Sequence, residues 1–315
     1  MKTIKPSALQ PGDTIGIIAP AGPVTKKAIA QAESYLGSKG YEVVLGKNLF
    51  KKRGYLAGTD QQRAYDINRM FADKKIKAVI CARGGYGTIR LLDQLDYLLI
   101  KNNPKILMGF SDITAMQLAI WSKTGLISFY GPMATIDLNK KMDRFTERNM
   151  WEMLSGNSLV NRALEKRSPW KIYKGGRARG RILGGCFSLI YPLIGTPYQP
   201  DFRGAILVIE DIEEDPYLID KGLHQLKHHG VLRQINGLVI GKMTRCTARK
   251  KPTLSLDQVI RDMLPQINGP VAANLDFGHT PAKLTIPIGI KGIIDTRKGL
   301  FTLSEKPLKM RNKNG

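Results

Sequence analysis

The stretch Lys105-Ile-Leu-Met-Gly-Phe-Ser-Asp-Ile-Thr-Ala-Met-Gln-Leu-Ala-Ile-Trp121 decides how the first half of this chain folds. It opens with a short apolar run, typical of a buried strand, and closes with apolar residues at the spacing of a helix packed on a sheet. Between them lies Gly109-Phe-Ser-Asp112, with Ser111 at the tip of the turn. Such a turn exposes the hydroxyl and points the first free N–H groups of the helix at the same place.

Two interpretations of Ser111 are open at this point. The turn has the form of a nucleophile elbow, although Ile113 stands where the G-x-S-x-G pattern has its second glycine. In the other interpretation, Ser111 or Asp112 is only the N-cap of the helix. This segment alone favours the cap, because capping serines far outnumber nucleophilic ones.

Outward from this stretch, the first half alternates apolar runs with helical patterns. The sequence predicts strands and helices in turn, with strands over 14–19, 41–45, 76–82, 106–108 and 126–130 and helices over 26–38, 60–71, 88–99 and 145–154. Apolar strands separated by helices indicate an α/β domain whose parallel sheet is covered on both faces. Ligands of such sheets bind at the carboxyl ends of the strands.

The loop Arg83-Gly-Gly-Tyr-Gly87 directly follows one of these strands. Its glycines allow the backbone to approach a ligand closely. Neither the G-x-G-x-x-G pattern nor a Walker pattern is met, so a nucleotide loop is not indicated. An oxyanion cradle and a simple tight turn remain, and the sequence alone favours the turn.

The second half has a different pattern. Periodicity is lost after Asn157, and we predict a first domain over 1–157, a linker over 158–180 and a second domain over 181–310. The second half is expected to be a small β-rich domain with few helices, not a continued α/β winding. Its clearest elements are a short helix within 184–191, strands over 205–209, 237–243 and 269–275, and a helix over 218–229.

Candidate catalytic residues lie where strands end. Glu210 directly follows an apolar strand, and His279 lies in a glycine- and proline-containing turn after another. The order Ser111, Glu210, His279 supplies a nucleophile, an acid and a base in the order of α/β-hydrolases, although order alone is weak evidence. His224 and His228 have metal-like spacing, but the H-E-x-x-H signature is absent and a solvated helix face is favoured.

Composition sets the broad class. The chain has 315 residues, 43% apolar and 24% charged, which is typical of a globular protein of two domains. Three scattered cysteines indicate neither a disulfide framework nor a zinc site. No secretory signal and no membrane span are recognisable, so we expect a cytoplasmic protein.

The formal net charge of +23 is unusual. The basic residues are spread along the chain, and no nucleic-acid-binding pattern is present, so nucleic acid is not the expected partner. A basic surface without a dedicated partner is one interpretation. Attraction of a small anionic substrate is the functional one.

Six short motifs give the chain a resemblance that runs almost from end to end. They are PGDTIGIIAPAGP at 11–23, ARGGYG at 82–87, GFSD at 109–112, GTPY at 195–198, IED at 209–211 and FGHT at 277–280. Together and in this order they resemble the LD-carboxypeptidase (muramoyltetrapeptide carboxypeptidase) family of serine peptidases, to which the microcin C immunity peptidases are related.

The resemblance implies specific roles. Ser111 would be the nucleophile, His279 the base and Glu210 the acid that holds it, and the N–H groups of Asp112 and Gly85 would form the oxyanion hole. A Rossmann-like first domain and a smaller β domain would enclose the site. The expected reaction removes the terminal D-alanine of the murein tetrapeptide, in the cytoplasm, during cell-wall recycling, without metal or cofactor.

The resemblance also leaves questions open. Arg83 and Tyr86 are candidates for substrate binding, with an ion pair to a carboxylate as the alternative role of Arg83. Cys186 stands where an asparagine is common, and Tyr130 where a histidine is common. The expected partner is a small anionic peptide or glycopeptide, and a homodimer is possible. The alternatives are a microcin C-type peptidase acting on aminoacyl-nucleotide amides and a non-catalytic basic protein that binds anionic glycopeptides.

Overall fold

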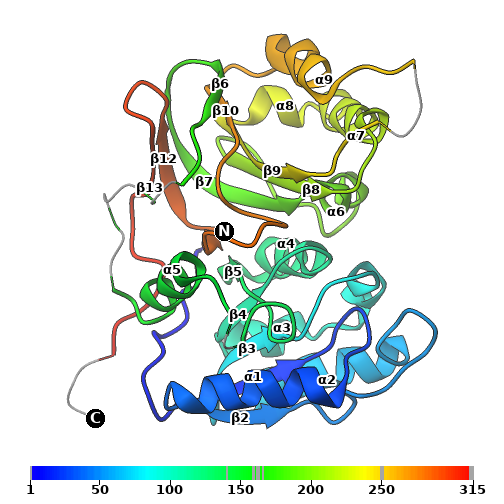
Figure 1. Cartoon of the computed structure of the whole chain (residues 1–315), viewed down its shortest axis with the longest axis vertical. Coiled ribbons are helices and arrows are strands. Elements are labelled where there is room, and N and C mark those ends of the chain that lie inside the picture. Colours follow the sequence, from blue (N-terminus) through cyan, green and yellow to red (C-terminus); the bar gives the residue numbers. More distant parts are fainter. Residues whose placement is uncertain are drawn as a thin grey trace.

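The computed structural model describes residues 2–139, 141–157, 160, 164, 167–248 and 252–311, which form two lobes stacked along the long axis of the molecule (Figure 1). The first lobe alternates strands and helices: β1 (Thr14–Ile18), α1 (Lys26–Ser38), β2 (Glu42–Leu45), α2 (Asp60–Ala72), β3 (Ile76–Cys81), the 3-10 helix η1 (Thr88–Gln94), α3 (Tyr97–Asn102), β4 (Ile106–Gly109), α4 (Ile113–Thr124), β5 (Ser128–Tyr130) and α5 (Arg144–Leu154).

The predicted elements of this lobe are confirmed, with one exception. The single helix expected over residues 88–99 is two helices, η1 and α3. The Asp96 carboxylate accepts the N–H of Leu99 at 2.8 Å and thereby caps a new helix. A side chain that caps locally competes with continuation of the preceding helix.

The strands β2, β1, β3, β4 and β5 are neighbours in that order and all pair in parallel. Consecutive residues are buried along β1 and β4, so both faces of the sheet are covered, as predicted. Because β3 and β4 are adjacent and parallel, the loops that follow them lie at the same edge. This arrangement brings the Arg83–Gly87 loop beside the Ser111 turn.

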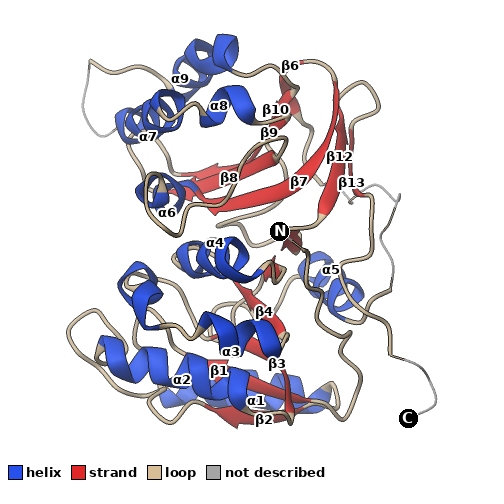
Figure 2. Cartoon of the chain, turned by 180° about the vertical axis from the view of Figure 1, so that it is seen from behind, coloured by secondary structure: helices blue, strands red, loops and turns tan. Residues whose placement is uncertain are grey.

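The second lobe contains more helix than the sequence suggested (Figure 2). Its elements are β6 (Lys171–Lys174), β7 (Arg177–Cys186), α6 (Phe187–Ile190), η2 (Tyr191–Leu193), β8 (Ile206–Ile212), α7 (Pro216–His228), α8 (Val231–Gln234), β9 (Gly237–Thr244), α9 (Leu256–Met263), η3 (Leu264–Gln266), β10 (Val271–Ala273), β11 (Ile286–Ile288), β12 (Lys291–Asp295) and β13 (Leu300–Leu303). No helix within the described ranges is long and apolar enough to cross a membrane.

Two expectations for this half were wrong. The strands β7, β8, β9 and β10 pair in parallel, so the α/β winding does continue at the centre of the lobe. The expected β-rich character is confirmed by a seven-stranded sheet, to which the end of the chain adds the antiparallel strands β12 and β13 at one edge. The predicted linker over residues 158–180 contains β6 and the start of β7, because charged and glycine residues there form strands with exposed positions.

Two elements join the lobes. Helix α4 lies between them (Figure 1), and nearly all its residues are buried, as expected for a helix covered on every side. Strand β11 comes from the C-terminal part of the chain but pairs antiparallel with β5 of the first sheet. The C-terminal segment predicted as one domain over residues 181–310 therefore contributes a strand to the first lobe.

Candidate active site

Ser111 occupies the turn between β4 and α4 in a strained conformation. Its φ is 65°, in the left-handed region that a serine rarely adopts. The N-cap of α4 is Asp112, and no side chain makes a capping hydrogen bond there. Asp112 thus occupies the N-cap position, as the capping interpretation expected, but neither Asp112 nor Ser111 supplies a side-chain cap. Strained residues of this kind cluster at functional sites, which favours the nucleophile elbow.

Glu210 and His279 form a hydrogen-bonded pair in the second lobe. Glu210 lies in β8 and is fully buried, whereas His279 lies in the loop after β10. The Glu210 Oε2 atom lies 2.9 Å from His279 Nδ1 and accepts the backbone N–H of His279 at 3.0 Å. An ionised carboxylate only accepts, so the Nδ1–H tautomer faces Glu210 and the Nε2 lone pair is left for a proton.

The surroundings of His279 fix its ring and its loop. The ring of Phe110, next to Ser111, meets the imidazole edge-on with 5.0 Å between the centroids. Thr244 donates its hydroxyl hydrogen to the His279 carbonyl at 2.7 Å. A side chain at Gly278, where φ is 101°, would collide with the Glu210 carboxylate. The imidazole is thus held against the first lobe by packing and against the second by hydrogen bonds.

Tyr130 connects the serine to this pair. Its hydroxyl oxygen accepts the backbone N–H of Ser111 at 3.1 Å, and its O–H donates to Glu210 Oε1. Ser111, Glu210 and His279 are therefore brought together where the lobes meet. Among the described residues, no hydrogen bond directly joins the Ser111 hydroxyl to His279. The sequence marked Tyr130 only as a departure from the family pattern and did not reveal this contact.

The glycine loop after β3 lies directly against Ser111. A Cβ atom added at Gly84 would lie 2.9 Å from Ser111 Cβ and 3.5 Å from the Asp112 nitrogen. The backbone N–H groups of Asp112 and of the adjacent Gly85 donate to no other group within the described part of the chain. Two free donors beside a serine hydroxyl are the components of an oxyanion hole.

Two buried charged side chains hold this loop: Asp112, which the sequence marked as a helix cap and for its N–H but not for its carboxylate contacts, and Arg63, to which the sequence did not point. The Asp112 carboxylate accepts the N–H groups of Gly87 at 3.2 Å and Thr88 at 2.9 Å. Arg63, from α2, donates to the carbonyls of Pro20 at 2.5 Å and Gly87 at 3.0 Å. Burial raises the pKa of Asp112 and lowers that of Arg63. In the sequence, Arg63 looks like any solvated helix arginine.

A pocket of about 540 Å³ adjoins the loop and contains three of the predicted residues. Its lining is Gly22, Pro23, Tyr55, Arg83, Gly85 and Tyr86. The rings of Tyr55 and Tyr86 meet edge-on with 5.7 Å between centroids, and both residues are exposed. Arg83 forms no ion pair with any described carboxylate, so its alternative role as an ion-pair partner is not found.

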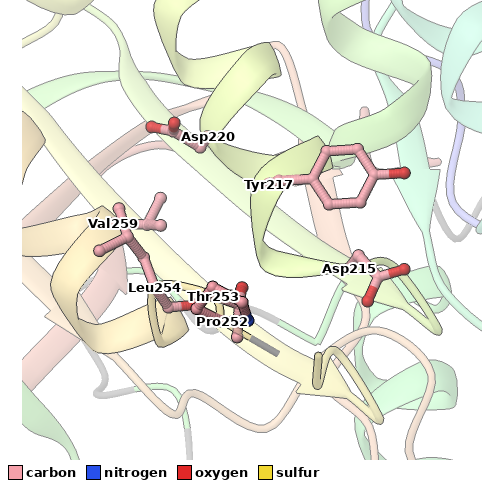
Figure 3. A pocket seen from close by; sticks show the side chains of 7 residues that line it. All are labelled: Asp215, Tyr217, Asp220, Pro252, Thr253, Leu254 and Val259. Atoms are coloured by element: carbon pink, nitrogen blue, oxygen red, sulfur yellow. The ribbon is translucent and has the colours of Figure 1, made fainter. Parts of the chain in front are cut away.

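A second pocket, of about 500 Å³, lies in the other lobe between the start of α7 and residues 252–259 (Figure 3). Asp215, Tyr217 and Asp220 line one side of it, and Pro252 to Leu254 and Val259 line the other. None of the predicted site residues belongs to this pocket. Of the two pockets, Arg83, Gly85 and Tyr86 line only the one beside the glycine loop.

Cys186 packs beneath the site without being reactive. Its sulfur lies 3.4 Å from Asp211 Oδ1 and 3.4 Å from the Ser188 hydroxyl, and the residue pairs with Glu210 in the sheet. Burial, followed by the charges of Glu210 and Asp211, raises the pKa of the thiol well above its ordinary value. The thiol therefore stays protonated, which excludes it as a nucleophile.

The two remaining histidines of interest lie on α7. The rings of His224 and His228 are 5.8 Å apart, and His224 Nε2 lies 3.6 Å from an Asp220 oxygen. Within the described residues, no group of three or more His, Cys, Asp or Glu side chains could hold a metal ion.

Comparison with known proteins agrees with this architecture. The chain is 38% identical to the "Probable murein peptide carboxypeptidase" of Bacillus subtilis, over 93% of this chain and 92% of the relative. The solved structure of MccF in complex with glutamyl sulfamoyl guanosine superposes with a TM-score of 0.86 at 26% identity, over 97% of this chain and 99% of that one. The muramoyltetrapeptide carboxypeptidase of Oxalobacter formigenes gives 0.77 at 30% identity, over 92% and 97%.

Domain descriptions match both halves of the chain. Residues 15–131 match the LD-carboxypeptidase N-terminal domain, and residues 179–294 match the LD-carboxypeptidase C-terminal domain. The two matches lie in the order of the two lobes and include Ser111, Glu210 and His279. This chain therefore belongs to the LD-carboxypeptidase family of peptidases.

Proposed function

We propose that the protein is a serine carboxypeptidase that hydrolyses the L,D peptide bond before the terminal D-alanine of murein tetrapeptide, a step of cell-wall recycling. The observation that carries the proposal is the convergence of a strained Ser111 with the Glu210–His279 pair. The names of the relatives from Bacillus subtilis and Oxalobacter formigenes support the choice of substrate.

In the proposed mechanism, the Nε2 atom of His279 takes the hydroxyl proton of Ser111 as the serine oxygen attacks the scissile carbonyl. Glu210 stabilises the imidazolium through Nδ1–H. The imidazolium then returns the proton to the leaving amine of D-alanine, and an acyl-enzyme remains. Water, activated by His279, releases the shortened peptide and restores Ser111.

The N–H groups of Asp112 and Gly85 are the proposed donors to the oxyanion. The N–H of Asp112 lies at the start of α4, and the N–H of Gly85 lies in the glycine loop. Hydrogen bonds from Arg63 and to the Asp112 carboxylate hold this loop against the start of α4 before substrate binds. Donors that need no reorganisation stabilise developing charge most effectively, typically by a few kcal/mol each.

The position of Gly84 makes a steric prediction. Gly84→Ala is expected to lower kcat by about 10²-fold, because the new Cβ would lie 2.9 Å from Ser111 Cβ and 3.0 Å from its hydroxyl oxygen and would displace the nucleophile. Gly37→Ala, on α1, is the matched control, since a Cβ there meets nothing within 4 Å. Steady-state kinetics of both variants check this expectation, and equal rates would contradict the placement of the loop.

Arg83 is proposed to bind the terminal carboxylate of the substrate. Arg83 lines the pocket together with Gly85 and has no carboxylate partner among the described residues. Removing one charge-assisted hydrogen bond typically costs about 1.5–3 kcal/mol, which corresponds to roughly 10- to 100-fold. We therefore expect Arg83→Gln to lower kcat/KM by that factor, mainly through KM.

The control for Arg83 is a second substrate whose C-terminal carboxylate is replaced by a carboxamide. Wild type and Arg83→Gln should cleave the carboxamide equally, because neither can make the ion pair. A variant that loses as much activity on the carboxamide as on the carboxylate would assign Arg83 to general support of the loop instead.

The proposed function is tested by measuring D-alanine release from purified murein tetrapeptide. Release that depends on Ser111 is expected, and the net charge of +23 should favour capture of this anionic substrate, so that KM rises with salt. Equal release by wild type and a Ser111 variant would contradict the serine-peptidase mechanism as proposed.

A second candidate is a microcin C-type peptidase that acts on aminoacyl-nucleotide amides. The similarity to MccF, with a TM-score of 0.86, favours considering it. Competition between murein tetrapeptide and an aminoacyl sulfamoyl nucleotide at matched concentrations decides between the two. The substrate with the larger kcat/KM is the one consumed first.

A further inference from the structure

We infer that Tyr130 is a positioning residue that fixes the Ser111 backbone and the Glu210 carboxylate relative to each other across the two lobes, an inference that rests on the proposed function. Tyr130 ends β5 in the first sheet, and Glu210 lies in β8 of the second. One hydroxyl group touches both the nucleophilic residue and the acid. No other described side chain bonds to both.

The direction of these two hydrogen bonds is fixed. The phenol has one proton, which it donates to Glu210 Oε1, and its oxygen accepts the N–H of Ser111. Burial and the neighbouring Glu210 charge raise the pKa of Tyr130 well above its ordinary value. The hydroxyl therefore keeps its proton and serves as donor to Glu210 while its oxygen accepts from Ser111.

The contact completes the bonding of Glu210. Oε1 accepts from Tyr130, while Oε2 accepts the backbone N–H of His279 and lies 2.9 Å from Nδ1. With both oxygens occupied, the carboxylate cannot rotate away from the imidazole. Without the Tyr130 hydroxyl, Oε1 would be a buried acceptor with no partner. The cost of that unsatisfied acceptor would favour rotation of the carboxylate toward another donor.

The contact also supports the strained turn. The N–H of Ser111 points to the Tyr130 oxygen while the residue adopts a φ of 65°. The tyrosine ring itself is 1% exposed and is enclosed by Phe110 and Phe277, whose rings meet it at 77° and 84°. A ring packed in this way presents its hydroxyl at one place only, so it sets the position of what it binds.

The test replaces the hydroxyl and keeps the ring. Tyr130→Phe is expected to lower kcat for D-alanine release about tenfold or more while KM changes less than about threefold, since substrate does not touch this hydroxyl. The rate at which a fluorophosphonate labels Ser111 should fall by a similar factor. Tyr35→Phe is the matched control, because Tyr35 is also buried and its hydroxyl donates to Glu147 at 2.7 Å on α5.

A second variant separates the two bonds. Incorporation of p-aminophenylalanine at position 130 keeps a donor for Glu210 but offers Ser111 a poorer acceptor, so its labelling rate should lie between those of Tyr130→Phe and wild type. Final extents of labelling report the folded fraction of each protein. A Tyr130→Phe rate equal to that of Tyr35→Phe, after this correction, overturns the inference.

The labelling assay also distinguishes failure of the proposed substrate. A wild type that labels at Ser111 but releases no D-alanine contradicts the murein substrate, and the labelling rates of the Tyr130 variants still decide the inference. A wild type that neither labels nor turns over contradicts both, because Ser111 would then not be a nucleophile.

Discussion

Replacing Ser111 with alanine is expected to lower the rate of D-alanine release by about 10⁴-fold or more. The serine oxygen is the atom that the proposed mechanism places on the substrate, and no neighbour can substitute for it. The nearby thiol of Cys186 is buried and its pKa is raised, so it offers no second nucleophile. The measurement is the release of D-alanine from murein tetrapeptide under saturating substrate.

Ser122→Ala provides the control for Ser111→Ala. Ser122 lies on α4, the helix that follows Ser111, and its hydroxyl donates to the Gln199 carbonyl at 2.9 Å, away from the site. It should keep a rate within a few-fold of wild type. Thermal unfolding of both variants checks that alanine at φ 65° does not simply unfold the turn. A folded Ser111→Ala protein with normal turnover would remove Ser111 from the mechanism.

Replacing Glu210 with glutamine is the second substitution with a large expected effect, a loss of about 10⁴-fold in kcat. Glu210 accepts three donors, from Tyr130 and from the backbone and ring of His279. An amide has one accepting oxygen and a donating nitrogen. At one or more of these contacts the amide N–H would therefore face another hydrogen-bond donor. The imidazole then loses its Nδ1–H tautomer or its orientation, and Nε2 no longer accepts the serine proton.

The same mismatch should lower the stability of the protein by about 1–3 kcal/mol, because a buried polar group is left unsatisfied. Glu213→Gln is the comparison for both measurements. Glu213 directly follows β8, the strand that contains Glu210, and its exposed pair with Arg245, at 2.6 Å, contributes little to stability. Denaturant unfolding and kinetics of the two variants are compared, and similar losses in both would argue that the end of the strand, not the Glu210 carboxylate, matters.

The first lobe could be predicted from the sequence because local patterns decide it. Apolar runs such as 76–82 become β3, and the helix expected over 26–38 is α1 with those bounds. The second lobe was less predictable. Strand β6 and the start of β7 carry exposed and charged positions that resemble a linker until they pair with distant strands. Pairing with distant strands leaves no periodic signal in the sequence itself.

The structure brings Ser111, Glu210 and His279 close together through Tyr130 and the Glu210–His279 hydrogen bond, and all three lie in motifs that are visible in the sequence, while their catalytic roles stay a prediction. The residues that support them were not predictable. Tyr130 reads as the end of an apolar strand, and Arg63 reads as a surface helix residue, yet both are buried. Their roles arise from bonds across 80 and 24 positions of the chain, to Glu210 and Gly87 respectively.

Strand β11 has a consequence for dividing the molecule. It follows the His279 loop closely, yet it pairs with β5 in the first sheet. A fragment that stops at residue 157 would lack this neighbour and leave the β5 edge bare, a template for aggregation. If the two lobes were co-expressed as separate fragments, the second fragment would have to add β11 to the sheet of the first before His279 could approach Ser111. The unbroken chain therefore helps to assemble the proposed site.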